Sequence, residues 1–264
     1  MEQGTATDIA AGSEAPAYDA IAAAYDLMMQ DRGPYVAFYA GVLAPSDRGL
    51  LDLACGTGTI TAALAQRMRA RHGGVRVTGV DGSAGMLAEA RQRDPAIDWR
   101  QGDLRALPPM APVDLAICCY NTLQHLDAAG LGQALRQIHG RLVPGGRLAF
   151  DIYRPNLPYL RQDRQDTLAR TLTGPDGAAL EIREDARFDE ARGILHIAWR
   201  LVPADRPEAA PLAATAYRLW QHAPATVEAA LAAAGFEMLD RWGGLDRSPW
   251  HDGALKQVIL ARAC

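Results

Sequence analysis

The sequence predicts an α/β fold: a doubly wound, mostly parallel sheet that carries an antiparallel β insertion after its fifth strand. From about residue 50 to residue 153, short apolar runs alternate with stretches of helical periodicity, as βαβ units require. From residue 181 to residue 222, three runs alternate apolar and polar residues, which is typical of antiparallel strands. We therefore expect an α/β core that is interrupted by an antiparallel sheet.

Composition excludes several classes of function. Of the 264 residues, 49% are hydrophobic and 22% are charged, which describes an ordinary globular protein. The net charge of −4 gives no electrostatic basis for binding nucleic acid. Because no signal-peptide pattern or long apolar segment is present, we expect a cytoplasmic protein that does not span a membrane. The four cysteines lack metal-ligand spacing, so no metal is expected, and Lys256 is the only lysine.

The central motif is a glycine loop after the first apolar strand. Residues 50–61 read LLDLACGTGTIT, an apolar run with an acid at Asp52 and glycines at Gly56 and Gly58, and a helical pattern follows. Such glycines let the backbone approach a ligand closely at the N-terminus of a helix. The motif therefore predicts a nucleotide-type site.

Three kinds of nucleotide site compete for this loop. A phosphate-binding P-loop needs a Lys-Ser/Thr pair after the second glycine, and none is present. A dinucleotide loop would place a third glycine where Thr61 stands. An acid at Asp52 would repel a pyrophosphate and favours a cationic or zwitterionic cofactor.

The form Asp-Leu-Ala-Cys-Gly-Thr-Gly resembles the first motif of class I S-adenosylmethionine-dependent methyltransferases, with Ala54 where many members carry glycine. Three further stretches resemble this family in order: Gly-Val-Asp-x-Ser-x-x-Met-Leu from residue 79, Gly-Asp-Leu at residues 102–104 and Pro-Gly-Gly at residues 144–146. The resemblance implies a Rossmann-like sheet of seven strands, the last of them antiparallel, and S-adenosylmethionine as the cofactor.

The expected cofactor contacts lie at the carboxyl ends of strands, where ligands of α/β sheets gather. Asp81 is placed to accept from ribose hydroxyls, and the resemblance implies that Asp103 accepts from the adenine amino group. The alternatives are a helix-capping acid for Asp81 and an ordinary Asx turn for Asp103. The residues expected to contact the cofactor are Tyr25, Asp52, Ala54, Cys55, Gly56, Gly58, Asp81, Gly82, Ser83, Met86, Gly102, Asp103, Leu104, Cys119, Tyr120 and Asn121.

In this family the exit of the fourth strand, here residues 120–126, faces the methyl group. DNA amino-methyltransferases carry Pro-Pro-Tyr there, and its absence favours a small acceptor. The resemblance implies that His125 is a catalytic base or positions the acceptor, and an imidazole suits the removal of a proton from an ammonium or a hydroxyl. The alternative is a structural histidine at the start of a helix.

We expect N-terminal lid helices over residues 1–45, of which residues 1–15 are frayed. Residues 18–29 predict one helix, with Tyr25 closing over the cofactor, and a second helix runs from Pro34 to Leu43. The core comprises residues 46–153 and 225–264, and the insertion, residues 154–224, covers the substrate site. Its expected acceptor contacts, together with the lid, are Tyr18, Tyr153, Tyr217, Trp220 and His222. The alternative for these side chains is a meander core or a partner interface, so a homodimer is one expectation.

The sequence thus predicts an enzyme that transfers a methyl group from S-adenosylmethionine to a nitrogen or oxygen of a small-molecule metabolite, as in the sugar-amine and natural-product methyltransferases that it resembles. The alternative is a protein of the same fold that binds the cofactor but is regulatory or performs non-methylating chemistry.

Overall fold

The computed structural model describes residues 15–264, so the expectation for residues 1–14 lies outside the described residues. The N-terminal elements are α1 (Ala15–Asp19), α2 (Ala22–Met28) and α3 (Gly33–Gly41). The alternating part comprises β1 (Gly49–Leu53), α4 (Thr59–Arg71), β2 (Arg76–Asp81), α5 (Ala84–Arg93), β3 (Asp98–Gln101), β4 (Val113–Cys118), the 3-10 helix η1 (Thr122–His125), α6 (Ala128–His139) and β5 (Leu142–Tyr153). The remaining elements are α7 (Leu157–Leu160), β6 (Arg164–Thr173), β7 (Ala179–Asp189), β8 (Ile194–Pro203), β9 (Ala213–Trp220), α8 (Pro224–Ala233), β10 (Phe236–Trp242) and β11 (Lys256–Ala263).

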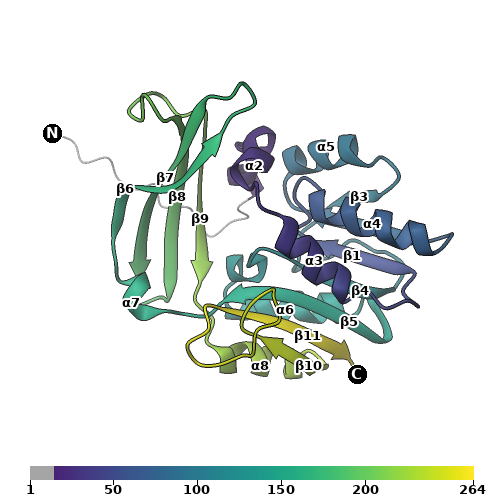
Figure 1. The fold of residues 1–264 in the computed structure, drawn as a ribbon. Helices are drawn as coiled ribbons and strands as arrows, with labels where there is room; N and C mark the ends of the chain where they lie inside the picture. The colour runs from purple at the N-terminus through teal and green to yellow at the C-terminus, as the bar shows by residue number, and fades with distance from the viewer. Residues whose placement is uncertain (1–14) are drawn as a thin grey trace.

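A seven-stranded sheet in the order β10-β11-β5-β4-β1-β2-β3 forms the centre of the protein (Figure 1). Neighbouring strands among β1 to β5 are parallel, whereas β11 pairs antiparallel with both β5 and β10. The chain moves outward from β1 through β2 to β3 and then crosses back to β4, which makes β1 and β4 the point where the strand order reverses. Ligand sites of such sheets lie at this point. The predicted fold class is confirmed.

Two layers of helices cover the faces of the central sheet. Helices α3, α4 and α5 bury side chains such as Tyr39 and Leu64 on one face. Helices α6 and α8 bury Leu135 and Leu231 on the other. All five residues of β1 are buried, which is why the strand reads as a continuous apolar run. None of the helices between residues 15 and 264 combines the length and apolar character that a membrane crossing requires.

The glycine loop packs tightly against the indole of Trp99 on β3. A Cβ atom on Gly58 would lie 2.5 Å from Cη2 of Trp99, and one on Gly79 of β2 would also collide with this ring. Gly58 in addition has a φ of 77°, a conformation that favours glycine. Close packing therefore fixes the loop beside β2 and β3.

A second sheet, antiparallel and in the order β6-β7-β8-β9, stands beside the central sheet (Figure 1). The sequence predicted three of its strands and missed β6. Nearly every residue of β6 is exposed, so this strand lacks the alternation of apolar and polar residues that marks a strand with one buried face. The insertion after β5 therefore contains four strands and the short helix α7, where three strands were expected.

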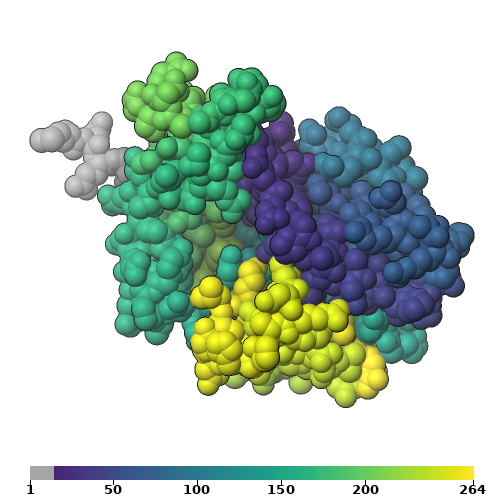
Figure 2. Space-filling model, viewed as in Figure 1, coloured from purple at the N-terminus to yellow at the C-terminus, as the bar shows by residue number. Residues whose placement is uncertain are grey.

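Helices α1 and α2 pack between α5 and the four-stranded sheet, and the purple N-terminal part of the chain lies between the green and blue parts in Figure 2. The single helix expected over residues 18–29 is divided into α1 and α2 by a turn. Ile21 in this turn is buried in a cluster with Met86 of α5. Asp19 Oδ1 accepts a hydrogen bond of 2.5 Å from Ser83 Oγ at the start of α5. These contacts attach the N-terminal segment to the region that follows β2.

Candidate active site

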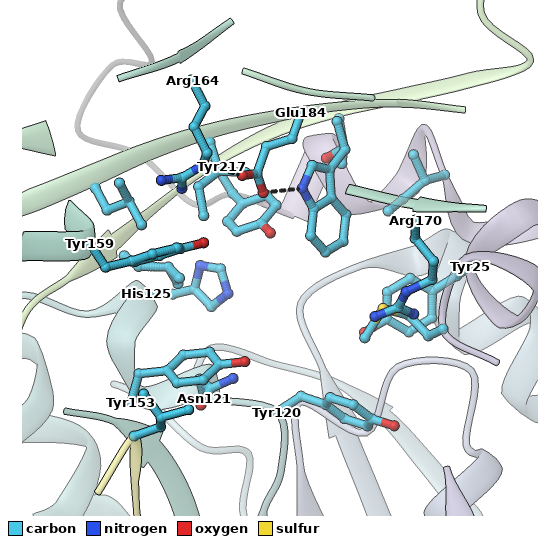
Figure 3. A pocket seen from close by; sticks show the side chains of 18 of the residues that line it. Tyr25, Tyr120, Asn121, His125, Tyr153, Tyr159, Arg164, Arg170, Glu184 and Tyr217 are labelled. Atoms are coloured by element: carbon cyan, nitrogen blue, oxygen red, sulfur yellow. Dashed lines mark hydrogen bonds and ion pairs between the residues drawn. The ribbon is translucent and has the colours of Figure 1, made fainter. Parts of the chain in front are cut away.

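A cavity of about 930 Å³ lies between the end of the central sheet, the N-terminal helices and the inner face of the four-stranded sheet (Figure 3). This volume is in the range of pockets that hold small organic ligands. The residues at the ends of β4 and β5 form what we call the cavity floor, and these are Tyr120, Asn121 and Tyr153. The other sequence-predicted site residues in the lining are Tyr18, Tyr25, His125 and Tyr217.

The carboxylate of Asp81 holds the glycine loop. Its Oδ2 accepts a hydrogen bond of 2.8 Å from the backbone N–H of Gly56, and its Oδ1 accepts one of 2.8 Å from the N–H of Ser83. Burial raises the pKa of Asp81, and these two hydrogen bonds oppose the rise. Ala54 and Gly56 have positive φ angles of 54° and 55°, so the loop turns sharply as it leaves β1. The acid that the sequence predicted at the end of β2 therefore faces the glycine loop.

Asp52 is buried in β1 and does not line the cavity. Its Oδ2 accepts a hydrogen bond of 2.6 Å from Thr61 Oγ1 in α4. Burial raises the pKa of Asp52 to about 7; the charge of Asp81 acts in the same direction, and the bond from Thr61 opposes it. The side chain joins β1 to α4, and its predicted contact with the amino end of a cofactor stays a prediction.

Helix α2 is attached to the glycine loop through Asp26. Asp26 Oδ1 accepts hydrogen bonds from Thr57 Oγ1 at 2.6 Å and from Arg32 Nη2 at 2.7 Å, and its Oδ2 pairs with Arg93. The Arg32 guanidinium also lies 5.2 Å from the centre of the Tyr25 ring. Burial raises the pKa of Tyr25 to about 12, so its hydroxyl stays protonated. Tyr25 is thereby held between the loop and the cavity.

Three rings from distant parts of the chain meet at one side of the cavity. Tyr18 OH lies 3.1 Å from His125 Nε2, and which atom donates depends on the tautomer of the imidazole. The ring of Tyr217 on β9 has its centre 5.6 Å from that of His125 and 6.2 Å from that of Tyr18. The structure therefore brings together one predicted residue each from α1, η1 and β9.

Glu184, a carboxylate in the wall of the cavity, is a site residue that the sequence did not predict. Glu184 Oε2 accepts a hydrogen bond of 2.8 Å from Trp199 Nε1, and its Oε1 accepts one of 2.7 Å from Arg164 Nε. A signal was present in the sequence: Ile182 and Ala186 are buried on the inner face of β7, and Glu184 is the acid between them on that face.

An ion pair next to the cavity floor was likewise not predicted from the sequence. Lys256 Nζ lies 2.6 Å from Asp151 Oδ2 and donates hydrogen bonds of 3.0 Å to Asn121 Oδ1 and 2.9 Å to Tyr35 OH. Asp151 interrupts an apolar strand and Lys256 begins β11, so each was visible as a charge in the sequence. Their proximity follows only from the pairing of β11 with β5.

Several predicted residues lie away from the cavity. Met86 is buried between α5 and the N-terminal helices. Asp103 forms an ion pair of 2.6 Å with Arg105, whose hydrogen bonds lower the pKa of that carboxyl. Trp220 lies three residues beyond a cavity-facing position of β9, hence on its outer face. His222 is buried with Nε2 2.8 Å from a main-chain carbonyl, and burial lowers its pKa.

None of the other predicted cofactor residues lines the cavity, and these are Ala54, Cys55, Gly56, Gly58, Asp81, Gly82, Ser83, Gly102, Leu104 and Cys119. Contact of these residues with a ligand stays a prediction. Within residues 15–264, no group of three or more His, Cys, Asp or Glu side chains is arranged to hold a metal ion.

Comparison with known proteins agrees with this geometry. Residues 50–146 match the model of a family described as "Methyltransferase domain". A trans-aconitate 2-methyltransferase of Azoarcus sp. is 41% identical over 132 residues, which cover 50% of this chain and 47% of that protein. A 2-phytyl-1,4-naphtoquinone methyltransferase of Thermosynechococcus vestitus is 41% identical over 125 residues, which cover 46% of this chain and 53% of that protein. The chain thus spans about half the length of the curated relatives it matches.

The likeness in fold extends further than the likeness in sequence. The solved structure of the CcbJ methyltransferase from Streptomyces caelestis superposes with a TM-score of 0.77 and covers 96% of this chain and 100% of that one, at 23% identity. Residues 50–146 therefore match a methyltransferase domain, and the chain as a whole has the fold of that solved methyltransferase.

Proposed function

We propose that the protein transfers a methyl group from S-adenosylmethionine to a nitrogen or an oxygen of a small molecule in the cavity. The observation that carries the proposal is that His125 and Tyr18 face the same cavity as Tyr120 and Asn121, which follow β4 at the reversal point of the sheet. In this proposal, residues 1–45 act as a lid, residues 46–153 and 225–264 hold the cofactor, and residues 154–224 cover the acceptor.

The residues beside the cavity fit this cofactor. Asp81 accepts hydrogen bonds from the N–H of Gly56 in the glycine loop and from the N–H of Ser83 after β2, and it retains lone pairs for the hydroxyls of a ribose. A Cβ atom on Gly56 would lie 3.6 Å from the Tyr25 ring, so this ring packs beside the loop backbone. S-adenosylmethionine would supply the methyl group, and Tyr25 on the lid would exclude water from it.

A small acceptor is favoured by the size of the cavity and by the relatives. The two curated relatives are named for trans-aconitate and for a phytylated naphthoquinone, both small molecules. The wall combines the rings of Tyr217 and Trp199 with the charges of Glu184 and Arg164. Such a lining suits a compact molecule that presents both an apolar face and polar groups.

The chain's own residues would orient the acceptor and take up its proton. Orientation alone can lower a barrier by about 7–11 kcal/mol in well-aligned systems. His125 would remove the proton from the attacking nitrogen or oxygen, a contribution of roughly 10²–10⁴-fold. Tyr18 would hold the imidazole in place through the bond at Nε2.

Two measurements test the proposal. Calorimetry should detect binding of S-adenosylhomocysteine, whereas NAD should neither bind nor raise the unfolding temperature. Incubation with S-adenosylmethionine labelled in the methyl group should then transfer label to a member of a panel of amines, phenols and organic acids. Cofactor binding without transfer to any acceptor would favour the non-methylating alternative, and the absence of binding would contradict the proposal.

A further inference from the structure

The turn after β4 holds two consecutive residues in an unusual conformation. Tyr120 has a φ of 58° and Asn121 a φ of 59°, and neither is glycine. Side chains make this left-handed region unfavourable, so such residues persist only where their surroundings fix them. Both residues form part of the cavity floor. Some feature of the structure must therefore hold this turn.

The ion pair of Asp151 and Lys256 supplies that hold from two sides. Asp151 Oδ1 accepts a hydrogen bond of 2.9 Å from the backbone N–H of Tyr120 and one of 3.0 Å from Tyr39 OH. Asp151 Oδ2 pairs with Lys256 Nζ at 2.6 Å, and the same ammonium donates to Asn121 Oδ1 at 3.0 Å. Each left-handed residue is thus bound by one member of the pair.

The two charges depend on each other because they are enclosed. The side chain of Asp151 is 0% exposed and that of Lys256 is 15% exposed. A buried carboxylate is tolerated where it is paired and its lone pairs accept hydrogen bonds, and here both oxygens do. The ring of Tyr153, the third residue of the cavity floor, lies 4.4 Å from Lys256 Nζ. The ammonium therefore contacts two of the three floor residues.

We propose that Asp151 and Lys256 are positioning residues, which hold the Tyr120–Asn121 turn and so fix the position of the cavity floor during methyl transfer. The expected effect on rate rests on the proposed function. The statement that the ion pair holds the turn does not depend on that function. Lys256 is not placed as a catalytic residue, since it does not line the cavity.

A spectroscopic experiment tests the structural part. Because the chain has one lysine, protein labelled with ¹⁵N-lysine gives a single Nζ signal, which reports Lys256 alone. We expect a signal that exchanges slowly with water, that is lost or displaced in Asp151→Asn, and that shifts on saturation with S-adenosylhomocysteine. A rapidly exchanging signal that is altered neither by Asp151→Asn nor by S-adenosylhomocysteine would overturn the inference. If calorimetry shows no uptake of that ligand, the proposed function fails, and the response to Asp151→Asn still decides whether the pair exists.

A pair of variants tests the effect on catalysis. Lys256→Met should lower kcat by about 10²-fold, as expected for a misplacement of about 1 Å, and should change KM for S-adenosylmethionine little. The matched control is Arg147→Met, because Arg147 lies on β5, the strand of Asp151, and pairs with the buried Asp47 at 2.6 Å, away from the cavity. Arg147→Met should lower the unfolding temperature but leave kcat within about twofold of the wild type.

Equal losses of kcat in the two variants would show that the ion pair matters only for stability, and would overturn the inference. If Lys256→Met does not fold, the double variant Asp151→Asn/Lys256→Met removes both charges and restores folding without restoring the bond to Asn121. Wild-type kcat in that double variant would also overturn the inference.

Discussion

The carboxylate of Asp81 and the backbone N–H of Gly56 are joined by a hydrogen bond of 2.8 Å, although 25 residues separate them in the sequence. The second oxygen of the same carboxylate accepts from the N–H of Ser83 at the start of α5. One side chain thus connects the glycine loop after β1 with the turn after β2. The geometry of the proposed cofactor site depends on this connection.

We expect Asp81→Asn to weaken the binding of S-adenosylhomocysteine by at least about tenfold, or about 1.4 kcal/mol. The amide retains one acceptor oxygen in place of two, so it cannot hold both backbone N–H groups. Calorimetry measures the affinity. Asp98→Asn on the neighbouring strand β3 is the control, since its side chain is 48% exposed and should leave binding unchanged. Equal affinity in wild type and Asp81→Asn would contradict the role given to this carboxylate.

The raised pKa of Asp52 predicts a dependence of stability on pH. Burial raises this pKa from 3.8 to about 7, so the folded protein retains a proton that the unfolded chain releases. The free energy of unfolding that Asp52 contributes is fully present below pH 3.8, decreases as pH rises, and is lost once pH passes about 7.

In Asp52→Asn this contribution should be absent. Between about pH 5 and about pH 8, the wild type should lose on the order of 2–3 kcal/mol relative to the variant. Urea unfolding at the two pH values measures the difference. A constant difference between wild type and variant would show that Asp52 is charged throughout this range.

Replacement of His125 by alanine should lower turnover by roughly 10²–10⁴-fold and leave the affinity for S-adenosylhomocysteine nearly unchanged, because the imidazole would act on the acceptor. Tyr18→Phe keeps the ring but removes the hydroxyl that bonds His125 Nε2, so it should cause a smaller loss. Single-turnover kinetics with the labelled cofactor measures both. Unaltered turnover in His125→Ala would remove the catalytic role of this residue.

Release of S-adenosylhomocysteine should be faster in Asp26→Ala, by about fivefold if loss of the hydrogen bond to Thr57 weakens lid closure by about 1 kcal/mol. Asp26 binds Thr57 in the glycine loop together with Arg32 and Arg93, so its removal frees α2 from the loop. Stopped-flow displacement measures the rate. Asp205→Ala, in an exposed pair, should leave the rate as it is in the wild type.

Elements with one buried face or two buried faces could be predicted from the sequence. The strands β1 and β4 read as apolar runs, and the alternation in β7, β8 and β9 indicated antiparallel pairing. Strand β6 could not be found this way, because it lies at an edge of its sheet and is exposed along most of its length. The segment forms a strand because it pairs with β7, and its own composition does not indicate this.

The residues of the candidate site also differ in whether the sequence reveals that they lie close together. Asp81 ends a strand that the sequence marks clearly, and the parallel pairing of that strand with the preceding strand β1 places it beside Gly56. Asp151 and Lys256 are 105 residues apart and meet because β11 returns antiparallel beside β5. Trp220 and Tyr217 were predicted together, although three residues along a strand place two side chains on opposite faces. Proximity through tertiary structure is the part that one sequence does not contain.

The packing of Trp99 limits which residues can change singly. Gly79 lacks the positive φ that would itself demand glycine, so its bare Cα is required only by the neighbouring indole and by the Cys55 sulfur. The substitution Gly79→Ala fits only after Trp99 and Cys55 have been replaced by smaller side chains. We therefore expect these positions to vary jointly among homologues, so that a library which randomises them one at a time would recover only the parental residues.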